Sequence, residues 1–262
     1  MHLFVFSFLW FILCFLIFEP SVCHAWGPLT HIYLANEILS LSYLLPPAVY
    51  GVIRHFREDF IYGNIMADTM IGKKYIPHDR NSHTWDFGFK LLRLADSHSQ
   101  KSFAYGYLCH LAADTVIHEI LSADKTNVEH TIYELKADSL VRKRYWLQAV
   151  AIDGMVQKRN DKFLETSMRK SFLSFKTNKR ILKSIVFMSL FTSMGFTSVP
   201  YWRRRAIQSP RNEVIVELRK QSLKRILDIM MHGEQSYVTS KNPSVEFKRK
   251  KRVDKLSSTT AA

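Results

Sequence analysis

The chain has 262 residues, 47% of them hydrophobic, and its 37 lysines and arginines exceed its 23 acidic residues to give a formal net charge of +14. This length is enough for one sizeable core or for one domain with a tail. The basic surplus favours anionic partners, either phospholipid head groups or nucleic acids, and does not choose between them.

Residues 1–25 are predicted to be a secretory signal peptide. An apolar run over residues 3–18 leads to Cys23-His24-Ala25, which places small residues at the first and third positions before a cleavage site. The run is short for a membrane span, but no Lys or Arg precedes it, so an uncleaved anchor stays open as an alternative. We expect an exported protein, secreted or periplasmic, with membrane association as a further option. Cleavage after Ala25 would make Trp26 the first mature residue.

The cysteines exclude a disulfide framework. Cys14 and Cys23 would leave with the signal peptide, so that Cys109 is the only cysteine of the mature chain. The stability of an exported protein of this kind must then come from its core and from bound metal. Cys109 is interpreted as a core residue.

Helical spacing of apolar residues recurs along the rest of the chain, and no run of strict two-residue alternation indicates a strand. The predicted fold class is therefore all-α, with a single helical domain over residues 26–232. Residues 57–86 are rich in Gly, Asp, Asn, Pro and His and are predicted to form a long functional loop. Helices are expected over residues 32–42, 46–56, 87–95, 103–121, 128–156, 161–175 and 213–231.

Residues 184–200 are a second apolar stretch, at the lower length limit of a membrane span. A buried core helix is expected there. An interfacial segment is an alternative, because Tyr201, Trp202 and three arginines follow at once and suit a lipid head-group layer, although these arginines equally fit a solvated turn. Residues 233–262 are polar and carry a basic run over residues 248–252, which predicts a disordered basic tail.

Histidines and acidic residues recur at four-residue steps on two neighbouring predicted helices. His110, Asp114 and His118 would share one face of the first helix, and His130 and Glu134 repeat the step on the second. A lone His on an apolar helix is usually a packed core residue, which is the alternative interpretation. Burying two carboxylates and three imidazoles together is costly unless a divalent cation neutralises them, so we favour a metal site.

Three further residues are candidates to complete this site. His31 lies close to the predicted new N-terminus, and Asp68 and His83 lie in the predicted loop. Taken singly each is a weak signal, because Asp68 could cap a helix and His83 could be a surface imidazole.

Four motifs taken together are more specific than any one of them. They are the Trp26 start with a nearby His, the Gly63-Asn64-x-x-x-Asp68 loop, the His83-Thr84-Trp85 loop, and the His-x-x-x-Asp…His…His-x-x-x-Glu pattern of residues 110–134. With them the chain resembles the zinc-dependent phospholipase C family, whose relatives include fungal single-strand nucleases and the catalytic domain of glycosylphosphatidylinositol-specific phospholipase D. The resemblance covers roughly residues 26–140, more weakly up to about 230, and implies an all-helical fold with up to three zinc ions.

The resemblance also implies a set of ligands for each zinc. The first zinc would be held by Asp68, His83, His110 and Asp114. The second would take His118, His130 and Glu134. The third would use His31, Asp114 as a bridging carboxylate, and the amino nitrogen and carbonyl oxygen of Trp26, a pair that signal cleavage completes. Imidazoles and carboxylates without a thiolate suit catalytic zinc, and Asp68 is the expected catalytic residue that orients or deprotonates the attacking water.

One spacing departs from the family pattern. His118 follows Asp114 by four residues, whereas the bacterial phospholipases and fungal nucleases typically leave a gap of six. The spacing is more like that of the phospholipase D relative, which leaves the placement of the second zinc and the nearest activity open.

The leading hypothesis is a secreted or membrane-associated phospholipase C-like enzyme that hydrolyses a phosphodiester with a metal-activated water. Its expected partner is a phospholipid or membrane surface, and no protein partner is inferred. The main alternative is a single-strand nuclease of the same fold, which would combine the same basic charge with stacking aromatics. A third hypothesis is a membrane-binding protein with a non-catalytic metal site.

Overall fold

The computed structural model describes residues 26–69, 81–120, 127–168, 173–198 and 210–244. Within these ranges the chain forms α-helices and short 3-10 helices and no strand, so the predicted all-α fold class is confirmed. The predicted signal peptide lies outside the described residues. The α-helices are α2 (Pro28–Ser40), α3 (Pro47–His55), α4 (Arg57–Met66), α5 (Trp85–Leu94), α6 (His98–Ile120), α7 (Asn127–Ser139), α8 (Lys143–Val150), α9 (Gly154–Ser167), α10 (Phe175–Ser198) and α12 (Asn212–His232). The 3-10 helices are η1 (Ser42–Leu44), η4 (Gly233–Gln235) and η5 (Tyr237–Ser240).

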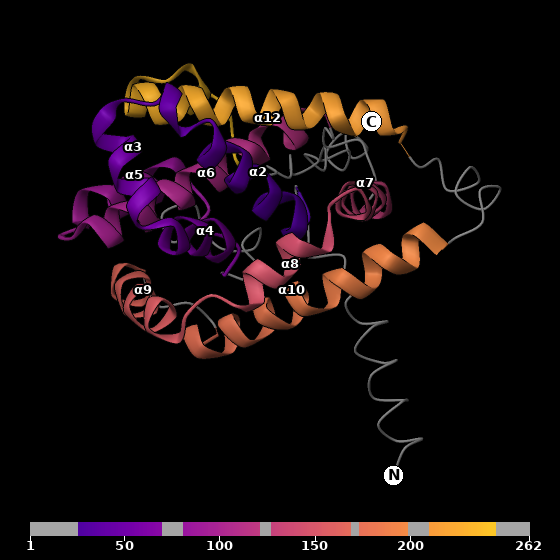
Figure 1. Ribbon diagram of the computed structural model, residues 1–262, viewed down its shortest axis with the longest axis horizontal. Coiled ribbons are helices and arrows are strands. Elements are labelled where there is room, and N and C mark those ends of the chain that lie inside the picture. The colour runs from indigo at the N-terminus through magenta and orange to yellow at the C-terminus, as the bar shows by residue number, and fades with distance from the viewer. Residues whose placement is uncertain (1–25, 70–80, 121–126, 169–172, 199–209, 245–262) are drawn as a thin grey trace, which may run out of the picture.

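Helix α6 lies at the centre of the fold. Its apolar residues are buried on every side, among them Ala104, Leu108, Leu111 and Val116. A helix that is apolar all round needs neighbours all round, and α4, α5 and α12 pack against it. Figure 1 shows α12 along one side of the molecule and α10 along the opposite side, with α2, α4 and α6 between them. The polar residues of α6 are therefore carried by an enclosed helix.

Two glycines bring the backbones of α4 and α6 into direct contact. A Cβ atom on Gly63 of α4 would lie 1.9 Å from the carbonyl oxygen of Phe103, and one on Gly106 of α6 would lie 1.9 Å from the carbonyl oxygen of Phe60. No other residue fits at either position, because real Cβ atoms do not approach backbone oxygens so closely. This contact places the end of α4, and Asp68 just beyond it, beside the centre of α6.

Helix α2 is anchored at its N-terminus by Asp138 of α7. The Asp138 carboxylate accepts hydrogen bonds from the backbone amides of Leu29, at 3.2 Å, and Thr30, at 2.8 Å. It satisfies donors that every helix start leaves open. Gly27 permits this approach, because a Cβ atom there would lie 2.4 Å from Oδ2 of Asp138. The anchored start fixes the direction in which His31 leaves the helix.

The loop predicted over residues 57–86 is wrong in its first part, which is helix α4. Gly63 and Asn64 resemble loop residues in the sequence, but both are buried where α4 meets α6. Tertiary packing, with Phe60 and Ile61 also fully buried, overrides their low helix propensity. Residues 70–80 of the predicted loop lie outside the described residues.

The long helix predicted over residues 128–156 is two helices, α7 and α8, with a break after Ser139. Helix α9 then begins at Gly154, because the side chain of Asp153 accepts hydrogen bonds from the amides of Met155 and Val156 and so caps it. An N-cap of this kind starts a new helix rather than continuing the previous one.

Residues 184–198 of the apolar stretch belong to α10, and the described side chains of α10 are not all buried. Leu182 and Val186 face the core, whereas Phe187 and Phe191 are 50% and 53% exposed. The expected core helix is therefore a surface helix with one buried face. Among the described residues, none of the helices combines the length and the apolar character needed to cross a membrane. The aromatic and basic residues 201–205 lie outside the described ranges.

The first twelve residues of the predicted disordered tail are folded. Helices η4 and η5 continue directly from α12, and Val238 is fully buried. The indole nitrogen of Trp85 donates a hydrogen bond of 2.7 Å to the carbonyl oxygen of Lys241. The prediction of disorder is thus wrong for residues 233–244, because Val238 and this long-range hydrogen bond hold them against the domain. Residues 245–262, which include the basic run, lie outside the described residues.

Candidate metal centre

Two ligand candidates lie one turn apart on α6, as their spacing predicts. His110 and Asp114 are each 1% exposed, and Nε2 of His110 lies 3.2 Å from Oδ2 of Asp114. Two residues between them in the sequence, Ala112 and Ala113, are small and fully buried. Because α6 is enclosed, both side chains are withdrawn from water, and their position is fixed by the helix backbone.

His83 reaches the same point from the segment that precedes α5. Its Nε2 lies 3.1 Å from Oδ2 of Asp114 and 3.1 Å from Nε2 of His110. This segment is held against α6 by Tyr107, whose hydroxyl donates to the carbonyl oxygen of Ser82 at 2.8 Å. His83 is fully buried, so the expectation of a surface imidazole is excluded.

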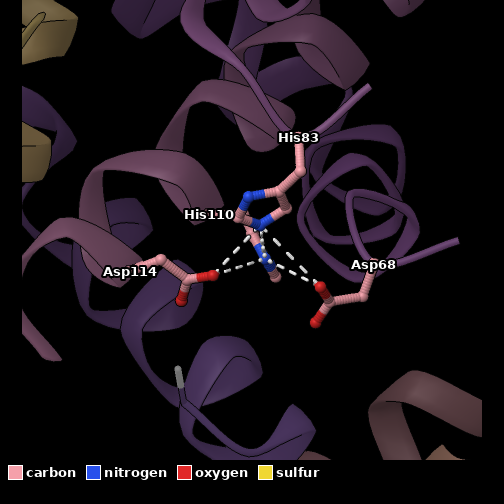
Figure 2. A group of neighbouring side chains, drawn as sticks. All are labelled: Asp68, His83, His110 and Asp114. Atoms are coloured by element: carbon pink, nitrogen blue, oxygen red, sulfur yellow. Dashed lines mark hydrogen bonds and ion pairs between the residues drawn. The ribbon is translucent and has the colours of Figure 1, made fainter. Parts of the chain in front are cut away.

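Asp68 completes the group from the end of α4. Its Oδ1 lies 3.5 Å from Nε2 of His110 and 3.8 Å from Nε2 of His83. Figure 2 shows the four side chains, Asp68, His83, His110 and Asp114, pointing toward one another. One potential ligand atom from each of the four lies within 4.8 Å of the others. Three separate segments of the chain therefore converge on one buried point.

His31 of α2 approaches Asp114 from the other side. Its Nε2 lies 3.0 Å from Oδ1 of Asp114, whereas His83 and His110 face Oδ2. The ring of His31 also stacks on that of His110. Asp114 thus presents each of its two oxygens to a different set of imidazoles.

These contacts fit a cation better than a hydrogen-bond network. Among the described residues, neither oxygen of Asp114 receives a correctly aligned hydrogen bond, although imidazole nitrogens lie 3.0 to 3.2 Å away. Buried carboxylate oxygens without aligned donors are costly in a protein interior. Nitrogen and oxygen donors that converge without a sulfur ligand have the chemistry of a catalytic zinc site.

The electrostatics of the centre favour positive charge between the carboxylates. Burial would lower the pKa of His110, but Asp114 and Asp68 outweigh burial and raise this pKa to about 9. Burial would likewise raise the pKa of Asp114, but His110 and His31 hold it well below its usual range. Burial and the charge on His110 lower the pKa of His31. A divalent cation would supply the positive charge that these two carboxylates attract.

A family model described as zinc-dependent phospholipase C matches residues 30–183. The chain belongs to the zinc-dependent phospholipase C family. This match confirms the resemblance drawn from the motifs, and it spans every ligand candidate except Trp26. No curated protein and no solved structure matches the chain. Membership of this family, together with the His and Asp cluster, supports zinc as the cofactor.

Two of the three residues expected to hold the second zinc, His118 and Glu134, have described side chains. His118 lies one turn beyond Asp114 on α6, and Glu134 lies on α7, but neither joins the group of four. His130 also lies on α7, and its side chain is outside the described residues. The role of these three residues as zinc ligands stays a prediction.

Trp26 is buried beside the centre. Its indole nitrogen donates to the carbonyl oxygen of Ala113, at 3.1 Å, and to the hydroxyl of Ser222, also at 3.1 Å. The first predicted mature residue is thereby tied to the neighbour of Asp114 on α6. Coordination through its amino nitrogen stays a prediction of the family resemblance.

Two residues near the centre were missed by the sequence analysis. Asp138 anchors α2, and Ser244 contacts His83 from the predicted tail, with its Oγ 3.2 Å from Nδ1 of the imidazole. Neither has a local signal, because each acts on a residue more than a hundred positions away. Cys109 lies in the core, as expected, and burial raises the pKa of its thiol.

Proposed function

We propose that this protein is a zinc-dependent phosphodiester hydrolase that acts on phospholipids in the manner of a phospholipase C. The observation that carries the proposal is the convergence of Asp68, His83, His110 and Asp114 within 4.8 Å at a buried point, with His31 on the far oxygen of Asp114. Family membership supports the same chemistry.

Asp68, His83, His110 and Asp114 would hold one zinc. His31 and Asp114, whose Oδ1 faces His31, would help to hold a neighbouring ion. Zinc in such a site makes a water acidic enough to act as a nucleophile near neutral pH and withdraws charge from phosphate oxygens. Two buried histidines fix the positions of the ligand atoms, because His110 lies on the enclosed helix α6 and His83 packs against it.

Asp68 is the candidate for the group that orients or deprotonates the attacking water. Its side chain is 15% exposed, whereas His83, His110 and Asp114 are at most 1% exposed. It is therefore the member of the cluster that a water or a substrate can reach from outside. A carboxylate at this position can accept a proton as the nucleophile attacks phosphorus.

The proposal includes export of the protein from the cytoplasm. Residues 1–25 would act as the signal peptide, and the protein would work outside the cytoplasm with Trp26 as its first residue. Mass spectrometry of the N-terminus of the protein purified from its natural compartment tests this step. A mature chain that still carries residues 1–25 would overturn it.

One assay separates the possible activities. The purified mature protein is incubated with phosphatidylcholine vesicles or with single-stranded DNA, and diacylglycerol, phosphocholine and nucleotides are measured. Release of diacylglycerol and phosphocholine that EDTA abolishes and zinc restores is expected. Release of nucleotides alone would replace the phospholipase proposal by a nuclease. Zinc binding with no product from either substrate would identify a non-catalytic metal site.

A further inference from the structure

The C-terminal segment reaches the metal centre from far outside the family-matched region. The family match ends at residue 183, yet Oγ of Ser244 lies 3.2 Å from Nδ1 of His83. The same hydroxyl donates a hydrogen bond of 2.8 Å to the carbonyl oxygen of His83. Ser244 therefore touches both the ring and the backbone of one ligand candidate.

The two contacts together favour one of the two ring nitrogens of His83 as the site of the proton. A serine hydroxyl has a single proton, and here it is used on the His83 carbonyl oxygen. Toward the ring, Ser244 then accepts, which favours the proton on Nδ1. The lone pair is left on Nε2, the atom that faces Asp68, His110 and Asp114. A neutral imidazole binds a metal through its unprotonated nitrogen.

We propose that Ser244 is a positioning residue that holds His83 in the Nδ1-protonated form and so aims Nε2 at zinc. The inference rests on the zinc site of the proposed function. A consequence of this role is that the folded domain needs residues 233–244, which carry Ser244 beyond α12, in order to bind metal tightly.

Ser244 is held in place by contacts of its own segment. Lys241 receives the indole hydrogen bond of Trp85, two residues after His83, and its ammonium donates to Glu119 at 2.8 Å. The amide of Ser244 donates to the side-chain oxygen of Asn242 at 2.9 Å. These contacts tie the segment to α5 and α6. The position of the hydroxyl is thus fixed by the fold.

The other side of His83 is fixed as well. Its amide donates to the side-chain oxygen of Asn81 at 2.9 Å, and Tyr107 of α6 holds the adjacent carbonyl of Ser82. The imidazole is thereby placed between α6 and the C-terminal segment. Removing the hydroxyl of Ser244 would leave the ring in place but would take away the acceptor that faces its Nδ1.

The test compares four substitutions in the full mature protein. Ser244→Thr keeps the hydroxyl. Ser244→Val introduces a side chain of the same shape as threonine but without the hydroxyl, and Ser244→Ala removes the hydroxyl without adding bulk. Ser240→Ala is the control, because the Ser240 hydroxyl donates to the carbonyl of Tyr237 in the same segment. Zinc affinity is measured by competition with a chromophoric chelator, and the protonated nitrogen of His83 is identified by nitrogen-15 NMR.

We expect Ser244→Val and Ser244→Ala to bind zinc about 10- to 100-fold more weakly, the usual effect of removing the partner of a histidine ligand. Ser244→Thr and Ser240→Ala should bind as the wild type does. In the zinc-bound wild type, the NMR signals of His83 should show a proton on Nδ1. Equal zinc affinity in Ser244→Thr and Ser244→Val, or a proton on Nε2 of His83 in the wild type, would overturn the proposal.

These readouts are independent of lipid hydrolysis. A wild type that binds zinc through His83 but releases no diacylglycerol would end the proposed function and leave the role of Ser244 standing. Full hydrolysis by the wild type, with unchanged zinc affinity in Ser244→Val, would end the role of Ser244 and leave the proposed function standing. Deletion of residues 245–262 should preserve zinc affinity, whereas deletion of residues 233–262 should lower it at least as much as Ser244→Val does.

Discussion

The ring of His31 stacks on the ring of His110, with the ring centroids 3.8 Å apart and the planes inclined by 12°. His31 comes from the first described helix and His110 from the central one, so the stack joins α2 to α6 at the metal centre. Both rings also face Asp114, which makes this carboxylate the point where the two helices meet.

Asp114→Asn should remove zinc and activity together. The amide keeps the shape of the carboxylate but loses the charge that three imidazoles surround, so we expect a fall in turnover of more than about 100-fold, beyond the usual effect of an outer partner. Zinc content by atomic emission is the measurement, with the exposed Asp96→Asn as control. Full zinc content in Asp114→Asn would remove Asp114 from the ligand set.

Asp68→Asn should separate binding from catalysis. Asp68 is the most exposed and most distant member of the group, so it contributes less to zinc affinity than Asp114 does. Loss of a positioned base should reduce kcat by about 100- to 10,000-fold. Zinc content and kcat are measured on the same preparation. Zinc loss in proportion to the loss of kcat would make Asp68 a ligand without a separate catalytic role.

A variant that retains extra residues before Trp26 should bind one zinc fewer than the mature protein. The buried indole of Trp26 places this residue next to Asp114 through Ala113, and the predicted third zinc uses its amino group. Metal stoichiometry by atomic emission tests the prediction against a sample whose N-terminus begins at Trp26. The same number of zinc ions in both samples would count against the terminal ligand.

Gly63→Ala should destabilise the domain, because the new Cβ atom would lie 1.9 Å from the carbonyl oxygen of Phe103. Overpacking costs about 1–3 kcal/mol or more, and here it would also push α4 away from α6. Gly51→Ala in α3 is the matched control. The new Cβ atom would meet nothing within 4 Å, so we expect the free energy of unfolding to rise by about 0.5–1 kcal/mol. Urea unfolding of both variants gives the comparison.

Asp138 should make stability fall as the pH rises from about 4 to about 6. Burial raises the pKa of Asp138 to about 6, against the opposing hydrogen bonds of Thr30 and Leu29, so the folded state binds this proton more tightly than the unfolded state. The contribution is present below pH 4 and is lost as the pH passes 6, by up to about 3 kcal/mol. Asp138→Asn should remove this slope in urea unfolding. If the free energies of unfolding of the wild type and Asp138→Asn differ by the same amount at every pH from about 4 to about 6, the prediction is contradicted.

The parts of the site that share a helix could be predicted from the sequence, and the parts that depend on tertiary contacts could not. The four-residue step from His110 to Asp114 follows from helix geometry alone. The composition of residues 57–86, rich in Gly, Asp, Asn, Pro and His, predicts a loop where α4 lies. Only the contact of α4 with α6 explains why a glycine of low helix propensity, Gly63, lies within a helix.

The C-terminal segment shows the same limit more clearly. Polar residues after α12 predict disorder, yet Val238 is buried and Ser244 reaches His83. The contact joins residues 161 positions apart, and no local pattern encodes it. His31 is only a weak signal in the sequence, because its place at the centre depends on the anchoring of α2 by Asp138.

The ligand candidates of the central group come from α6, from the end of α4 and from the start of α5, and His31 adds α2. Ions held by these residues would act as crosslinks that exist only in the native state. Because zinc would bind only the folded state, it would raise the free energy of unfolding by about 4 kcal/mol when the free zinc concentration is a thousand times the Kd. Chelation would therefore lower the melting temperature as well as stop the proposed hydrolysis, and the lifetime of the folded protein would depend on the zinc supply of its surroundings.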